Sequence, residues 1–192
     1  MEDNFSPRQS LDLIQAMISK TKSNLSENSI YFLLWGWVTF IAIIGQFILK
    51  VVLSYEHHYL VWLLTIPTAV ISFVYSARRH NRHKLKTYIG ESMSYLWTGI
   101  GISIFILCMI ITRTTGGWLN AWPFFILMYG LGTFVSGMIL KFKPLVIGGV
   151  LCWLLTIISL FVNFDYQLLL AGAAILCSYI IPGHLLRTAN YQ

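Results

Sequence analysis

Six continuous apolar stretches without a single Asp, Glu, Lys or Arg make up most of this chain. They cover residues Ile30–Leu49, Tyr59–Ala77, Met93–Thr112, Leu119–Leu140, Leu145–Val162 and Gln167–Gly183. A helix needs about 20 apolar residues to cross the hydrocarbon core of a bilayer. Backbone polar groups in that core must be paired within the protein, so continuous apolar stretches cross it as helices. The sequence therefore predicts an all-α, polytopic membrane protein with six transmembrane helices.

The composition agrees with this class of protein. Only 10% of the 192 residues are charged and 57% are hydrophobic, whereas about 25% of the residues of a soluble domain are charged. A transmembrane barrel would need segments of about 10 residues that alternate between apolar and polar side chains. The stretches here are continuously apolar, so a barrel is excluded.

The basic residues predict how the chain is oriented. Eleven of the 13 Lys and Arg residues lie in the two tails and in the second and fourth loops, and only Lys50 and Arg113 lie in the other loops. Cytoplasmic loops carry an excess of Lys and Arg, so we expect both termini to be cytoplasmic. The net charge of +6 follows from this orientation, and we expect no nucleic-acid partner. No short apolar run precedes Ile30, so we expect no cleaved signal peptide.

The predicted organisation is a cytoplasmic tail over residues 1–28, a transmembrane domain over 29–186 and a short cytoplasmic tail over 187–192. Within the first tail, apolar residues at helical spacing predict an amphipathic helix over about 7–22. Its apolar face includes Leu11, Ile14 and Ile18. Such a helix lies on the inner membrane surface or docks a soluble partner, and both alternatives stay open.

The second loop carries the strongest charge cluster of the chain, the sequence Arg78-Arg79-His80-Asn81-Arg82-His83-Lys84-Leu85-Lys86. Cations near the surface attract anionic lipid by about 1 kcal/mol each, and an acidic protein partner would be attracted in the same way. We therefore expect a candidate contact surface made of Leu11, Ile14, Ile18, Arg78, Arg79, Arg82, Lys84 and Lys86.

Polar residues within the apolar stretches are few. The second, fourth and sixth stretches each carry a Ser that precedes a basic or imidazole group, which would fit three tandem helical hairpins or the chance recurrence of cytoplasmic charges. Small residues also recur four apart, as in Gly99 with Ser103 and Gly132 with Ser136, a spacing that lets helices approach closely. If a pore exists, its candidate polar lining is Ser72, Ser136, Ser178, Glu91 and His184.

Two prolines and a Pro-Gly pair predict where helices bend or end. Pro67 and Pro123 fall within their apolar stretches and should interrupt them, because proline removes a hydrogen bond from a helix interior. Pro182 and Gly183 should end or break the last helix, which would leave His184 in the interfacial zone.

No catalytic or cofactor-binding pattern is present. The chain contains no G-x-G-x-x-G or Walker sequence and no G-x-S-x-G or H-E-x-x-H sequence. Its cysteines, Cys108, Cys152 and Cys177, lie in three different stretches and are expected to be reduced packing residues. His80 and His83 alone make a poor zinc site. We expect no cofactor, no metal and no enzymatic activity, and the absence of buried charge at mid-span argues against a proton-coupled transporter.

Several short motifs occur in a distinctive order. They are Ser10-Leu11-Asp12-Leu13-Ile14 with Met17-Ile18, then Leu34-Trp35-Gly36, Trp122-Pro123, Phe142-Lys143-Pro144 and Ile181-Pro182-Gly183-His184. In this order the chain resembles a family of uncharacterised small bacterial multi-pass membrane proteins. The resemblance implies six helices in the bacterial inner membrane, and it implies no particular chemistry.

These observations favour a non-enzymatic integral membrane protein that acts as an accessory, sensory or regulatory component. Its expected partners are the lipid bilayer, with anionic lipid at the cytoplasmic face, and a protein partner or further copies of the chain. The alternative is a small channel or facilitator for an uncharged or cationic solute. A third hypothesis, a lipid-modifying enzyme, would need a polar cluster around His80, Glu91 and His184.

Overall fold

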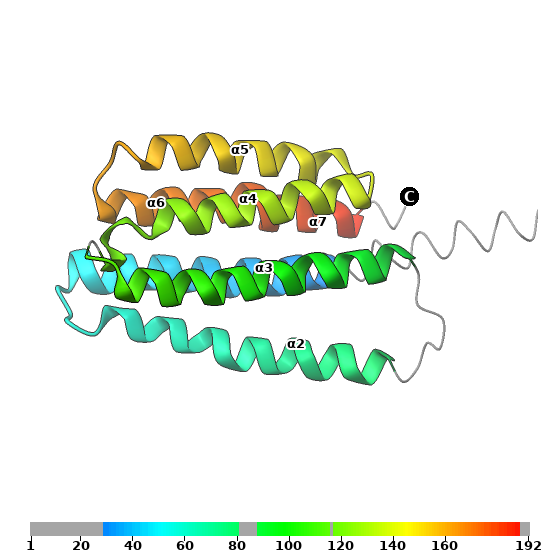
Figure 1. Cartoon of the computed structure of the whole chain (residues 1–192), viewed down its shortest axis with the longest axis horizontal. Helices are drawn as coiled ribbons and strands as arrows, with labels where there is room; N and C mark the ends of the chain where they lie inside the picture. Colours follow the sequence, from blue (N-terminus) through cyan, green and yellow to red (C-terminus); the bar gives the residue numbers. More distant parts are fainter. Residues whose placement is uncertain (1–28, 81–87, 116, 189–192) are drawn as a thin grey trace, which may run out of the picture.

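The computed structural model describes residues 29–80, 88–115 and 117–188, and every regular element in these ranges is a helix (Figure 1). The chain folds into six helical rods, several of which change helix type along their length. The first rod is Ser29–Val52, whose last turn is the π-helix η1 (Ile48–Val52). The others are η2 (His58–Leu64) with α2 (Thr65–His80), α3 (Tyr88–Arg113), α4 (Trp122–Ile139), α5 (Lys143–Ser159), and α6 (Phe164–Ile175) with η4 (Leu176–Ile180) and α7 (Ile181–Thr188); η3 (Gly117–Asn120) precedes α4.

Consecutive rods run in opposite directions, as short connections require. In Figure 1, α2 lies at one side of the bundle and α5 at the other, and α3 lies between them. The first rod begins and α7 ends at the same end of the bundle. The opposite end, called here the Lys50 end, holds the connections after the first, third and fifth rods.

Five of the rods are long and apolar enough to cross a membrane. The predicted all-helical class and the presence of several membrane-length helices are therefore confirmed. The remaining rod, α5, is apolar but has only 17 residues, which gives about 26 Å at 1.5 Å per residue against a core of about 30 Å. Six membrane spans stay a prediction.

The tightest packing lies among α4, α5 and the last rod. A Cβ added at Gly137 would lie 2.6 Å from the backbone N of Val146, and one added at Gly149 would lie 2.7 Å from the backbone N of Phe134. A Cβ at Gly148 would lie 2.6 Å from the carbonyl oxygen of Cys177. Glycine therefore lets these helices touch backbone to backbone, which is a common way of packing helices in membranes.

The second and third rods are much less enclosed. Of the 18 consecutive residues that form the most apolar part of each rod, only 6% and 11% are buried in the second and third rods. The corresponding shares are 44% in α4 and 56% in the last rod. The core therefore sits in the C-terminal half of the bundle, and α2 and α3 lie at its periphery.

The prediction that Pro182 and Gly183 end or break the last helix is wrong, because α7 runs through both residues to Thr188. The π-helical turn of η4 ends at Ile180, two residues before Pro182, and such a widened turn accommodates the missing N–H and the ring of a proline. Gly183 is buried against the first rod, where an added Cβ would lie 3.0 Å from Leu33. The Pro-Gly pair is thus a packing element within the helix.

The prediction that Pro123 interrupts its helix is also wrong. Pro123 lies in the first turn of α4, and the residues from Leu119 to Asn120 belong to the separate turn η3. A proline in the first turn interrupts nothing, because its N–H would have no partner inside the helix. Pro67 lies in the first turn of α2, just after the change from the 3-10 turns of η2 to α-helix.

Candidate functional site: a polar cluster at the Lys50 end

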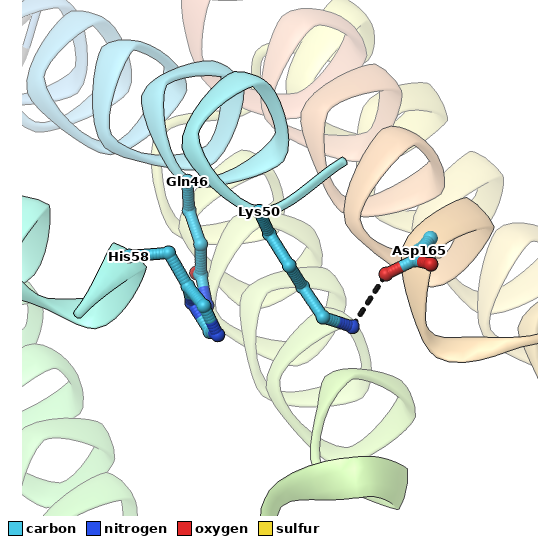
Figure 2. Close-up of polar contacts among 4 residues, drawn as sticks. All are labelled: Gln46, Lys50, His58 and Asp165. Atoms are coloured by element: carbon cyan, nitrogen blue, oxygen red, sulfur yellow. Dashed lines mark hydrogen bonds and ion pairs between the residues drawn. The ribbon is translucent and has the colours of Figure 1, made fainter. Parts of the chain in front are cut away.

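Four polar side chains from three rods meet at the Lys50 end (Figure 2). Gln46 and Lys50 stand one turn apart on the first rod, His58 begins η2, and Asp165 lies in the first turn of α6. Because the first rod ends here and the last rod begins here, the cluster joins segments that are far apart in the sequence.

An ion pair links the first rod to the last. Lys50 Nζ donates to Asp165 Oδ1 at 2.5 Å, and the same ammonium lies 4.0 Å from the centre of the Phe164 ring. The Lys50 side chain is 28% exposed and that of Asp165 is 44% exposed. Each charge also suits its place, since Lys50 is in the last turn of its helix and Asp165 is in the first turn of α6.

A hydrogen-bonded chain links the first rod to the second. Trp62 Nε1 donates to Gln46 Oε1 at 2.7 Å, and Gln46 Nε2 lies 3.2 Å from His58 Nδ1. Gln46 is buried and His58 is half-buried. The Trp62 ring packs against the Trp122 ring of α4, with 5.6 Å between their centres. The amide of Gln46 is therefore enclosed between two rods, and both ends of it are used.

The predicted contact surface lies mostly outside the described residues. Leu11, Ile14 and Ile18 precede residue 29, and Arg82, Lys84 and Lys86 fall between residues 80 and 88. Arg78 and Arg79 are in the last turns of α2, but their side chains are not described. The contact surface and the amphipathic helix therefore stay predictions.

The three serines of the predicted polar lining have different surroundings. Ser72 of α2 accepts a hydrogen bond from Trp35 Nε1 of the first rod at 3.1 Å. Ser136 of α4 and Ser178 of η4 are fully buried, and within the described part of the chain their hydroxyl groups have no hydrogen-bond partner. In this conformation neither buried hydroxyl is accessible to water.

Glu91 and His184 lie on different rods and take part in local contacts. Tyr95 Oη donates to Glu91 Oε1 at 2.6 Å, one turn along α3. His184 is exposed on α7, and its carbonyl oxygen accepts a hydrogen bond from Thr188 Oγ1 at 3.0 Å. No hydrogen bond or ion pair joins Glu91 to His184 within the described ranges.

Sequence reasoning missed the cluster at the Lys50 end. Gln46 was given no role from the sequence, and Lys50 was noted only as one of two basic residues outside the segments predicted to be cytoplasmic. That second observation was a usable signal, because a cation outside the expected side calls for a local partner. The described residues contain no group of three or more His, Cys, Asp or Glu side chains that could hold a metal ion.

The fold defines the chain as an all-helical protein with helices of membrane-spanning length and composition. Comparisons with protein-family models, with curated proteins and with solved structures find no match. The resemblance to small bacterial multi-pass proteins therefore stays an expectation.

Proposed function

We propose that this chain is a non-enzymatic component of the bacterial inner membrane that acts through contacts with another protein. The observation that carries this proposal is the uneven burial of the bundle. The rods containing α2 and α3 are only slightly buried by the rest of the chain, whereas α4 and the last rod are well enclosed. Surface that the chain itself leaves uncovered is available to lipid and to the helices of a partner.

The use made of the polar side chains supports the same proposal. The contacts of Gln46, Lys50 and Ser72 join helices within the bundle. Polar side chains committed to holding helices together are a structural device, in contrast to groups that converge on a substrate. A regulatory or sensory component needs a bundle of this kind and no reactive centre.

We further propose six spans with both termini in the cytoplasm. Two features support this orientation. The first rod begins and α7 ends at one end of the bundle, which also holds the connection between α4 and α5 (Figure 1). Lys141 and Lys143 belong to that connection and to the start of α5, and Arg187 is in the last turn of α7. Cytoplasmic connections are rich in such residues. Reporter fusions at each terminus and after Ser54 would test the orientation, and an external signal from either terminus would contradict it.

The test of the partner proposal is a pull-down from native membranes in a mild detergent, followed by mass spectrometry. We expect a partner in stoichiometric amount. In this proposal the amphipathic tail and the basic second loop make the contact, so binding should be lost when residues 1–22 are deleted and Arg78, Arg79, Arg82, Lys84 and Lys86 are changed to Gln. Changing Lys141 and Lys143 to Gln is the matched control, since it removes two cytoplasmic charges from another loop.

Unchanged binding by the combined variant would contradict the proposal that these surfaces make the contact. Its topology must be checked with the same reporter fusions, because removing basic residues from a loop can change its side of the membrane. A pure homo-oligomer without any partner would turn attention to the channel alternative and to flux measurements in liposomes.

A further inference from the structure

We infer that Gln46 and His58 form a pH-sensitive latch between the first and second rods. The latch is a hydrogen bond that the neutral imidazole accepts and that the protonated imidazole cannot accept. The inference concerns the helix bundle alone, and it does not depend on the proposed partner contacts.

The direction of the hydrogen bond follows from the chemistry of the three groups. An indole N–H is only a donor, so the atom of Gln46 that lies 2.7 Å from Trp62 Nε1 must be the carbonyl oxygen. The amide nitrogen of Gln46 then faces His58 Nδ1 at 3.2 Å and donates to it. His58 is therefore neutral in this arrangement and carries its proton on Nε2.

Protonation of His58 removes the acceptor, because both ring nitrogens of the cation are donors. Turning the Gln46 amide over would offer its oxygen to the imidazolium, but it would place the NH₂ group against the N–H of Trp62. One hydrogen bond is lost in either case. Gln46 is only 5% exposed, so water has little access to replace it.

The surrounding charges do not compensate for this loss. The charged groups that act on His58 from other elements are Lys50 on the first rod and Asp165 on α6, and these two already pair with each other. The helix α4, which carries Trp122, has no charged side chain. The connection that leads into His58 carries two further titratable residues, Glu56 and His57.

The latch matters because few residues of the second rod are buried in the bundle. Besides the Trp62–Gln46 hydrogen bond, its contacts with the first rod include the Trp35–Ser72 hydrogen bond, an edge contact between Tyr31 and Tyr75, and the approach of Val61 to Gly45. Losing the hydrogen bond between Gln46 and His58 loosens the start of this rod. A fall in pH at the Lys50 end is thereby converted into a change in how the first two rods pack.

The first test is the tautomer of His58 in the full-length protein, measured by ¹⁵N NMR with labelled histidine in detergent micelles or nanodiscs. The His58 signal is assigned as the one that disappears in His58→Gln. We expect the Nε2–H tautomer at pH 8 and its replacement by the cation as the pH is lowered. A proton on Nδ1 at pH 8, or a cation at that pH, would overturn the latch.

The second test compares thermal unfolding at pH 8 and at the lower pH at which the NMR spectrum shows His58 protonated. We expect the loss of one hydrogen bond to lower the unfolding midpoint at that pH by about 2–4 °C in a chain of this size. His58→Gln keeps an acceptor but cannot titrate, so it should lose that part of the pH response. His57→Gln, at the exposed neighbouring position, should respond like the natural chain. The latch is wrong if His58→Gln shows the full response; if that variant does not fold, the tautomer alone decides.

Discussion

The contact between α4 and α5 at Gly137 gives a sharp test of the described packing. A Cβ at this position would lie 2.6 Å from the backbone N of Val146, 2.8 Å from Val146 Cγ2 and 2.9 Å from Leu145 Cβ. Favourable separations for non-bonded atoms are about 3.5–4.0 Å. The change Gly137→Ala therefore requires the two helices to separate by about 1 Å here. A flexible side chain could turn away, but a backbone nitrogen cannot.

The expected magnitude combines two opposing effects. Overpacking of a close-packed interior typically destabilises by about 1–3 kcal/mol, and a backbone obstacle belongs at the upper end of this range. Alanine regains about 1 kcal/mol of helix propensity over glycine. The net expectation for Gly137→Ala is thus a loss of about 2 kcal/mol in the free energy of unfolding.

The matched control is Gly101→Ala on α3, where no atom lies within 4 Å of an added Cβ. Only the propensity gain applies at this position, so the variant should be neutral or up to about 1 kcal/mol more stable. Both changes add one methyl group to an apolar helix, and they differ only in what that methyl meets.

The assay is unfolding by SDS in mixed micelles, followed by circular dichroism, with the thermal midpoint as a second measurement. We expect the midpoint of Gly137→Ala to fall by about 4–8 °C and that of Gly101→Ala not to fall. Equal stability of the two variants would refute the close approach of α4 and α5. A loss confined to Gly101→Ala would show that α3 is the enclosed helix.

Three further predictions concern contacts between other helices. In a double-mutant cycle, Lys50→Ala and Asp165→Ala should show a coupling below about 1 kcal/mol, because both side chains are partly exposed; a larger coupling measured by unfolding would mean that the pair is better shielded. Gly45→Cys with Val61→Cys should form a disulfide on mild oxidation, since the Cβ positions lie 4.0 Å apart, and failure to cross-link on a gel would argue against this packing of the first two rods. Gln167→Met should reduce stability by about 1–3 kcal/mol, because the Gln167 amide donates to the carbonyl of Ser159 at the end of α5 and to that of Val162 in the connection that follows; an unchanged unfolding midpoint would contradict it.

The membrane-length helices were predictable because the signal for them is local. A window of about 20 apolar residues must pair its own backbone groups in lipid, whatever surrounds it. The ends of the helices depend on more than this window. Pro182 looked like a terminator, yet the π-helical turn before it lets the helix continue, and no residue pattern around Leu176–Ile180 announces that turn.

The packing partners of each helix were not predictable, and the small residues show why. Gly99 with Ser103 and Gly132 with Ser136 have the same spacing, but a Cβ at Gly132 would lie 2.7 Å from the Ile100 side chain, whereas one at Gly99 meets nothing within 4 Å. The spacing of small residues four positions apart indicates only that another helix could approach closely at that face. Whether another helix is there depends on the order of the rods in space.

The cluster at the Lys50 end depends on that same order. Lys50 and Asp165 are 115 positions apart, and they meet only because the first and last rods lie side by side with opposite directions. The local sequence around each residue favours a helix end and nothing more, since a cation suits a last turn and an anion suits a first turn. A basic residue outside the segments predicted to be cytoplasmic should therefore be expected to pair with an acidic residue at the same end of another helix. In this chain the search for that acidic residue would have been short, because the carboxylates that the described residues place at the Lys50 end are Glu56, just before η2, and Asp165, in the first turn of α6.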